Sequence, residues 1–251
     1  MASLPLGSNI NFFMLGLNET YFTEVMQRIA DGLKADPHHR LLSWDHAWKH
    51  WMKYALDPAG DDDLAALHLA FYLASWGMYR GSSDLLYRDY KALIPAVQFL
   101  KSTSHLAWQD FIFNSKGSTE EVSEALSALA LGLQQRLEPK LVRPGKVKIS
   151  VSDTLLSKIL LNTLGCVPAF DSEVKSALIH ILGPKYPMGD GFDAKRLTAA
   201  IELARHNEKL LRAGKGFLEK ELSEIYPLTK VFDFYLWHHG FDLPKKTKLK
   251  K

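Results

Sequence analysis

The feature that most constrains the fold is a stretch that is apolar on nearly every face of a helix. Residues 64–80 read LAALHLAFYLASWGMYR, and the acidic run 61–63 precedes them at the expected helix N-terminus, where the helix dipole favours negative charge. Gly81 follows and is expected to end the helix. A helix without a polar face must be covered on all sides. The sequence therefore predicts that 64–80 is the central helix of a helical core.

Helix start and stop signals recur along the rest of the chain. Asn18 is expected to cap a helix that runs to about Lys34, and Ser118 with Glu121 matches a capping box. Strand signals are nearly absent, apart from KVKIS at 146–150. The sequence therefore predicts a compact all-α protein of about ten helices. Further helix starts are expected at Ser43, Ser83, Ser152 or Asp153, Asp171 and Asp193, the last of these running to about Arg212.

The composition is typical of one folded domain in a reducing compartment. Hydrophobic residues make up 47% of the 251 residues, and the single cysteine, Cys166, cannot form an internal disulfide. The first residues lack the basic region of a secretory signal, and the longest apolar stretch, 65–79, is too short to cross a bilayer. We expect a cytoplasmic protein without a membrane partner. Its domain spans 1–251, either undivided or in two lobes at about 18–138 and 146–240.

The net charge of +3 is unevenly distributed. Five lysines lie within residues 245–251, in a tail (244–251) that is expected to be flexible, so the rest of the chain carries −2. The segment 139–158 is locally basic, with five cations and only Asp153 to oppose them. The chain lacks the overall basic field of many nucleic-acid-binding proteins, but this segment is expected to attract phosphate.

Residues 149–182, ISVSDTLLSKILLNTLGCVPAFDSEVKSALIHIL, contain an ordered set of motifs. The phrase Leu161-Asn162-Thr163 is followed by Gly165, by a turn with Pro168 and by Asp171 at a helix start. This order resembles the helix-hairpin-helix DNA glycosylase superfamily, to which endonuclease III belongs. There an L-N-T-x-x-G phrase precedes a V-D-T-x-V phrase that carries the catalytic aspartate. The resemblance covers 34 residues and implies a helix-hairpin-helix element, base flipping and Asp171 as the catalytic carboxylate.

The segment departs from the superfamily in two ways. Residues 149–153 contain no glycine, whereas the family's hairpin is glycine-rich, so that its amides can approach a phosphate. Leu155 occupies the position of the lysine nucleophile found in members that also cleave the strand, and Lys158 is the only nearby lysine that could replace it. The resemblance therefore implies base removal alone, by a monofunctional N-glycosylase.

Further site residues are expected around this segment. Thr154, Lys158 and Asn162 are spaced i, i+4 and i+8, so they share one stripe, which is either a solvated face or a contact with the DNA backbone. Lys158 joins Asp171 in the catalytic set. The residues expected to bind DNA are Lys146, Lys148, Asp153, Thr154 and Asn162. The residues expected to line the pocket for the flipped base are Trp76, Tyr79, Arg80 and Phe170.

Other patterns point to different functions. His46 and His50 have the spacing of metal ligands on a helix, but no glutamate completes an H-E-x-x-H motif, so neither a metal nor a cofactor is expected. The stretch from Arg40 to His46 matches R-x5-H, which resembles the active-site phrase of the all-α HEPN-type ribonucleases. A further alternative is a non-catalytic helical interaction protein, in which Asp171 is only a helix N-cap.

The function that these observations favour is hydrolysis of the N-glycosidic bond of a damaged or hypermodified base. The expected partner is double-stranded DNA that contains this base. A phage base modification and chemical damage are both admissible targets, so the biological role is DNA repair or antiviral defence. A fixed carboxylate stabilises the positive charge that develops on the sugar, and the nucleotide must leave the base stack to reach it.

Overall fold

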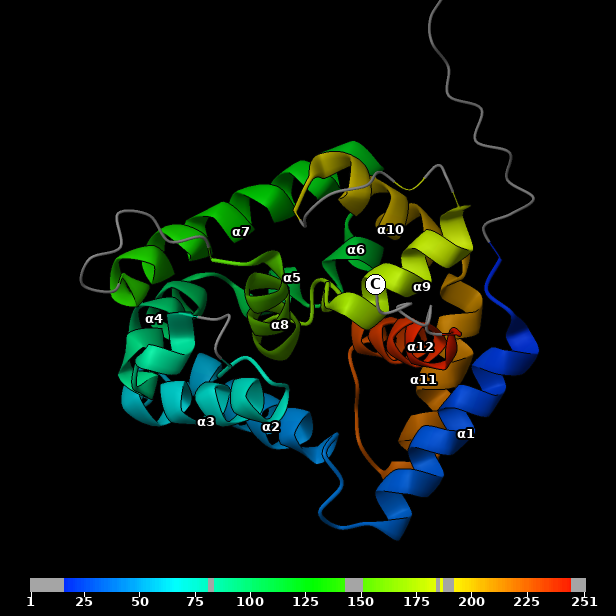
Figure 1. Cartoon of the computed structure of the whole chain (residues 1–251), viewed down its shortest axis with the longest axis horizontal. Helices are drawn as coiled ribbons and strands as arrows, with labels where there is room; N and C mark the ends of the chain where they lie inside the picture. Colours follow the sequence, from blue (N-terminus) through cyan, green and yellow to red (C-terminus); the bar gives the residue numbers. More distant parts are fainter. Residues whose placement is uncertain (1–15, 81–83, 143–150, 184–185, 187–191, 245–251) are drawn as a thin grey trace, which may run out of the picture.

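Among the residues that it describes, the computed structural model contains twelve α-helices and two short 3-10 helices (Figure 1). It describes residues 16–80, 84–142, 151–183, 186 and 192–244, and no strand occurs within these ranges. The all-α prediction is confirmed. No helix in the described ranges is both long and apolar enough to cross a membrane.

The helices follow one another with short connections. The α-helices are α1 (Glu19–Ala35), α2 (Leu42–Leu56), α3 (Asp62–Ser75), α4 (Ile94–Ser102), α5 (His105–Trp108), α6 (Phe111–Asn114), α7 (Thr119–Leu141), α8 (Asp153–Thr163), α9 (Ser172–Leu182), α10 (Ala194–His206), α11 (Glu208–Leu222) and α12 (Leu228–Asp242). The two 3-10 helices are η2 (Asp84–Tyr87) and η3 (Tyr90–Leu93).

Side-chain caps fix several helix starts where the sequence predicts them. The Asn18 side chain accepts a hydrogen bond from the Tyr21 amide at the start of α1. Ser118 and Glu121 form the complete capping box of α7. Asp171 caps α9 and Asp193 caps α10, each through its carboxylate. The predicted starts of these four helices are confirmed.

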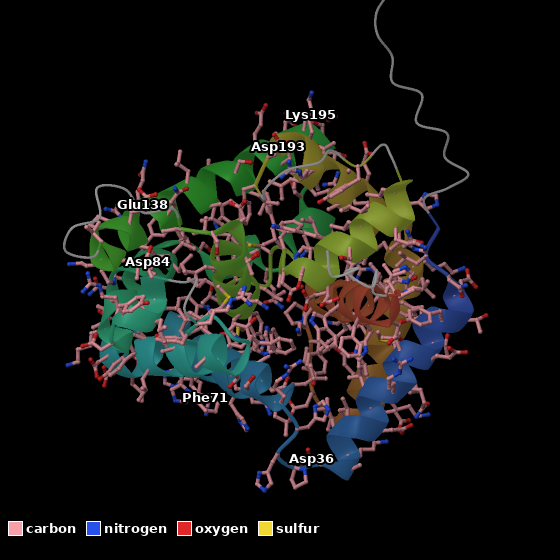
Figure 2. The ribbon with its side chains drawn as sticks, viewed as in Figure 1. Asp36, Phe71, Asp84, Glu138, Asp193 and Lys195 are labelled. Carbon is pink, nitrogen blue, oxygen red and sulfur yellow. The ribbon has the colours of Figure 1, made fainter. Side chains whose placement is uncertain are left out.

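Helix α3 is not the fully covered centre that the sequence predicts for 64–80. It ends at Ser75, and Gly77 just beyond it has a left-handed φ of 71°. Its inner face packs on α2, α4 and α8. Leu64, Leu67 and Phe71 form an outer stripe, and Phe71 projects from it with 58% of its surface exposed (Figure 2). The prediction is wrong because the sequence of a helix that is apolar on all faces does not show which face stays exposed to solvent.

Helix α8 occupies the centre instead. Every residue from Leu155 to Thr163 is buried, and α8 packs against α2, α3 and α7. In Figure 1 it lies enclosed between α7 on one side and α2 and α3 on the other. Residues of both predicted lobes contribute to one continuous hydrophobic core.

Two predicted helices differ in form. The helix expected after Ser83 is replaced by η2 and η3, and α4 begins only at Ile94. The long helix expected from Asp193 is broken at Asn207, where α10 ends and α11 begins. The Asn207 side chain donates a hydrogen bond to the Leu203 carbonyl and accepts one from the Leu17 amide at 2.9 Å. These bonds tie the break to the start of the described chain.

The packing of α11 on α1 gives a test of the fold. A Cβ at Gly214 would lie 2.5 Å from the ring of Phe22, which is buried. Gly216, two residues on in the same helix, has no atom within 4 Å of its Cβ position. We expect Gly214→Ala to lower the free energy of unfolding by about 1–3 kcal/mol through overpacking. Gly216→Ala should raise it by roughly 0.5–1 kcal/mol, because alanine loses less backbone entropy in a helix.

Urea denaturation of both variants measures this difference. Two equal effects would contradict the packing of α11 on Phe22.

Candidate functional site

An ion pair joins the two residues that the sequence places in the catalytic set. The Lys158 ammonium lies 3.0 Å from Oδ2 of Asp171, and the two side chains are 4% and 13% exposed. Lys158 projects from the middle of α8, and Asp171 stands at the start of α9. The structure therefore brings together two groups that are 13 positions apart in the sequence.

The Asp171 carboxylate is held at both of its oxygens. Oδ1 accepts hydrogen bonds from the amides of Glu173 and Val174, each at 3.1 Å, and Oδ2 receives the Lys158 ammonium. The positive end of the α9 dipole adds to these interactions. The carboxylate is thus fixed in position, surrounded by donors, and still reaches the surface with part of its side chain.

The turn before Asp171 is anchored from two sides. On one side, the Ser157 hydroxyl accepts the Phe170 amide, and the Thr154 hydroxyl donates to the Phe170 carbonyl, both at 2.8 Å. On the other side, Asp233 of α12 accepts the Ala169 amide at 2.8 Å. Helices α8 and α12 together therefore fix where the turn delivers Asp171.

A second buried ion pair lies beside the first. The Lys230 ammonium is 2.8 Å from Oδ2 of Asp233, with side-chain exposures of 3% and 7%. The ring of Trp76 lies near both ammonium groups, 5.0 Å from that of Lys158 and 5.9 Å from that of Lys230. Two lysines and two aspartates thus form a compact, largely buried cluster beside the Trp76 ring, which we call the Lys–Asp cluster.

Tyr72 shows how far the cluster is removed from water. It is fully buried, and burial together with the carboxylates of Asp233 and Asp171 raises the pKa of its phenol well above the usual value. The phenol is therefore neutral throughout the physiological range.

Trp76 links the Lys–Asp cluster to the surface. It is partly exposed, and its indole N–H donates to the Ser43 hydroxyl at 3.2 Å. The guanidinium of Arg40, an exposed residue, lies 4.5 Å above the Trp76 ring, and the ring of Trp237 meets Trp76 edge-on at 5.8 Å. A cation and two aromatic rings therefore stand where the cluster approaches solvent.

The predicted base-pocket residues do not form one group. Trp76 borders the Lys–Asp cluster, but Phe170 is 1% exposed and packs in the core against Phe192, so it cannot line an open pocket. Tyr79 is partly buried; burial raises the pKa of its phenol to about 12, and its hydroxyl meets no partner in the described part of the chain. Arg80 is exposed, so its guanidinium is solvated and needs no partner within the protein.

The predicted exposed stripe of α8 is wrong. Lys158 and Asn162 are 3% and 1% exposed, and Asn162 donates to the Trp44 carbonyl at 3.2 Å. Only Thr154 and the first-turn residue Asp153 remain partly exposed. The stripe is polar because it faces the buried groups of α2 and α9. Lys146, Lys148, residues 149–150 of the expected hairpin and 245–251 of the tail lie outside the described residues.

The histidines and Arg40 of the alternative patterns have other surroundings. Arg40 stacks on Trp76, whereas His46 lies exposed on α2. His50 stacks on His68 with ring centroids 4.0 Å apart. Within the described ranges, no group of three or more histidine, cysteine or acidic residues could hold a metal ion.

Sequence reasoning missed Lys230, Asp233 and Trp237, and it considered Arg40 only as part of the R-x5-H pattern. The signal for the first two was available, because a lysine and an aspartate spaced i, i+3 interrupt the apolar helix 228–237, and buried charges must be paired. Arg40 and Trp237 carried no such signal, since their contact with Trp76 joins distant parts of the chain.

Comparisons of the chain with protein-family models, with curated proteins and with solved structures found no match. The interpretation of the site therefore rests on its own geometry and on the resemblance over 149–182.

The buried ion pair predicts a large cost for removing its cation. Lys158→Met keeps the apolar stem but leaves the Asp171 carboxylate without its ammonium partner. We expect the free energy of unfolding to fall by about 3 kcal/mol, as is usual when one partner of a buried pair is removed. Lys34→Met removes a surface pair with Glu221 and should cost less than about 1 kcal/mol. Similar small losses in both variants would show that the Lys158–Asp171 pair is not buried in solution.

A buried carboxylate next to the Lys–Asp cluster predicts a pH dependence. Burial raises the pKa of Asp45 to about 6, and the nearby Lys230 opposes this only in part. In the unfolded chain the pKa is about 3.9. Between about pH 4 and 6 the folded protein thus holds a proton that the unfolded chain has lost, so stability falls as pH rises through this range.

Asp45→Asn should remove this dependence. The stability difference between variant and wild type should shift in favour of the variant by roughly 2–3 kcal/mol between pH 4 and 7. Thermal or urea denaturation across this range measures the shift, and parallel curves for the two proteins would contradict the burial of an ionised Asp45.

Proposed function

We propose that the protein is a DNA N-glycosylase that hydrolyses the bond between the sugar and a damaged or hypermodified base in double-stranded DNA. The observation that carries this proposal is the Lys158–Asp171 pair at 3.0 Å, within the segment whose motifs resemble the helix-hairpin-helix glycosylases. Asp171 is the proposed catalytic carboxylate, and Lys158 positions it.

The chemistry of the pair supports this role. Hydrolysis adds hydroxide from water to C1′ of the sugar and a proton to the departing base, and positive charge builds on the sugar as the bond breaks. Asp171 is a carboxylate whose two oxygens are held by Lys158 and by the α9 amides, so it need not reorganise to face that charge. Its partial exposure leaves it open to the sugar or to the attacking water.

The surroundings of Trp76 support base flipping. A nucleotide must leave the stack before its glycosidic bond can be reached, and enzymes of this kind hold the flipped base between aromatic and polar groups. Trp76, Trp237 and Arg40 offer such groups next to the Lys–Asp cluster. We assign Trp76 to the base pocket and leave DNA repair and antiviral defence as the two proposed biological roles.

A non-catalytic helical protein is the second candidate. The 3% exposure of Lys158 favours it, because a pair buried so deeply also fits a purely structural tie between α8 and α9. The two candidates differ in what the charge of Asp171 does, which a substitution can test.

Asp171→Asn separates the two candidates. Asparagine is nearly the same size and is also a good N-cap, so α9 should keep its start. The free energy of unfolding should still fall, because the buried Lys158 ammonium loses its counter-charge. The neutral amide cannot stabilise a developing cation, and we expect the rate of base release from modified duplex DNA to fall by about a hundredfold or more. Single-turnover assays well below the melting temperature measure this rate.

Asp193→Asn is the matched control. Asp193 caps α10 through the Lys195 amide, just as Asp171 caps α9, and Figure 2 shows Asp193 and Lys195 at the edge of the molecule. This variant should release base at the wild-type rate. A folded Asp171→Asn protein with full activity would show that Asp171 has a structural role only and is not catalytic.

A further inference from the structure

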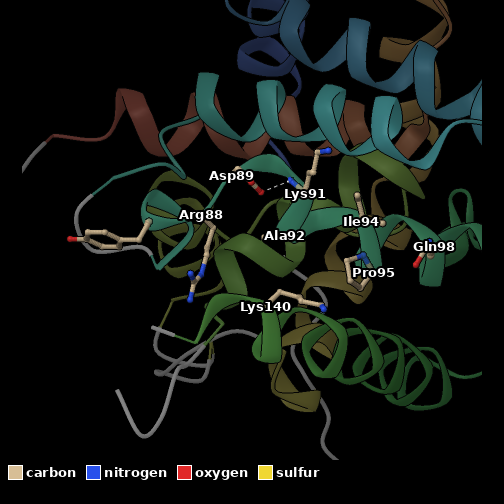
Figure 3. Close-up of a pocket in the computed structure, with 9 residues that line it drawn as sticks. Arg88, Asp89, Lys91, Ala92, Ile94, Pro95, Gln98 and Lys140 are labelled. Carbon is tan, nitrogen blue, oxygen red and sulfur yellow. Dashed lines mark hydrogen bonds between the residues drawn. The ribbon is translucent and has the colours of Figure 1, made fainter. Parts of the chain in front are cut away.

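A hollow lies where η2, η3 and α4 meet the C-terminal end of α7 (Figure 3), and none of the Lys–Asp cluster lines it. Its volume is about 670 Å³, within the range of roughly 300–1,000 Å³ that is typical of small-molecule sites. Three cations line it, namely Arg88, Lys91 and Lys140. Asp89 is the one acidic residue of the lining, so the walls carry a net charge of +2.

Arg88 is held in place while keeping donor capacity. One of its terminal nitrogens donates to the carbonyl of Val142, which fixes the plane of the guanidinium. Its Nε is buried and meets no acceptor in the described part of the chain. A buried donor without an acceptor is costly. Because Nε has no exposed surface, a ligand oxygen reaches it only when the guanidinium turns toward the hollow. The planar fork of arginine suits phosphate oxygens in particular.

Both lysines are cationic, but only Lys140 is without a partner among the described residues, because Lys91 already faces Asp63. The Lys91 ammonium lies 3.5 Å from Asp63 on the open surface, and that carboxylate raises the lysine's pKa, so Lys91 stays cationic. Asp89 is engaged with the Lys91 amide, which its carboxylate accepts at 3.0 Å, as Figure 3 shows. Lys140 is exposed, and no hydrogen bond or ion pair is found for it among the described residues.

The rim of the hollow adds an aromatic surface. Tyr87 is 51% exposed, and the ring of Pro95 lines the same hollow. Aromatic faces stack on nucleobases, whereas basic side chains such as the three in this lining bind phosphate. A ligand with a planar base and a phosphate matches both parts of this lining.

We propose that this hollow binds the phosphate ester of a nucleotide, with Arg88, Lys91 and Lys140 around the phosphate and Tyr87 against the base. The phosphate ester belongs either to a free nucleotide or to the backbone of a nucleic-acid strand. This site is separate from the proposed catalytic one, because it shares no lining residue with the Lys–Asp cluster. The base-release assay and the binding experiment below can therefore fail independently.

The experiment uses the full chain and two probes, adenosine 5′-monophosphate and a fluorescein-labelled single-stranded DNA of twelve nucleotides. Titration calorimetry and fluorescence anisotropy measure binding at about 50 and 200 mM salt. The test variant is Lys91→Gln/Lys140→Gln, which changes two exposed side chains. We expect it to weaken binding by at least about tenfold. For the oligonucleotide, the slope of log K against log salt should decrease in magnitude by roughly 1.4.

Lys209→Gln is the matched control. Lys209 is an exposed lysine of α11, and Figure 1 places α11 at the opposite edge of the molecule from α4 and the end of α7. This variant should bind both probes as the wild type does.

The two probes distinguish the sources of the phosphate. Binding of both, lost in the double variant, supports a site that a free nucleotide can fill. Binding of the oligonucleotide alone, weakened in the double variant but not in Lys209→Gln, supports a contact with a nucleic-acid backbone. If neither probe binds at low salt, or if the double variant behaves like Lys209→Gln, the proposal is overturned.

Discussion

The removal of charge from water at the centre of the molecule is the constraint on which the rest of the structure depends. Lys158 and Asp171 lose most of their hydration between α8 and α9, and such a loss costs several kcal/mol per ion unless every charge is matched. The ion pair, the α9 amides and the Trp76 ring together supply that compensation. Much of the surrounding architecture holds these charged groups in position relative to one another.

Helix α12 is the main example. Its Asp233 fixes the turn that delivers Asp171, and its Lys230 neutralises Asp233 in turn. The same helix packs so closely on α9 that Gly240 lies against the Glu173 backbone with no room for a side chain. The catalytic proposal and the stability of the core therefore involve the same contacts. A group that must be rigid to stabilise a transition state is here held by a network in which each charge has a partner.

The sequence predicts helix starts well and helix surroundings poorly. Caps such as Asn18, Ser118 and Asp171 act within one turn, so local chemistry determines them. The spacing of Lys158 and Asn162 correctly places them on one stripe, yet spacing cannot say whether a stripe faces water or a buried partner. Asn162 is bonded to a residue 118 positions earlier in the chain, which no local pattern could predict. Asp171 is paired with Lys158, only 13 positions earlier, and the sequence did place these two residues in one site.

The central claim is that Asp171 stabilises a cationic sugar, and this can be measured without knowing which base is recognised. Duplex DNA with a cationic azaribose analogue at one position mimics the charge of the transition state, and duplex DNA with tetrahydrofuran at that position lacks it. Transition-state mimics bind about a hundredfold tighter or more when an enzyme is complementary to that state. The ratio of the two dissociation constants should reach that size in the wild type. Equal affinity of the wild type for both duplexes would contradict the assignment of Asp171.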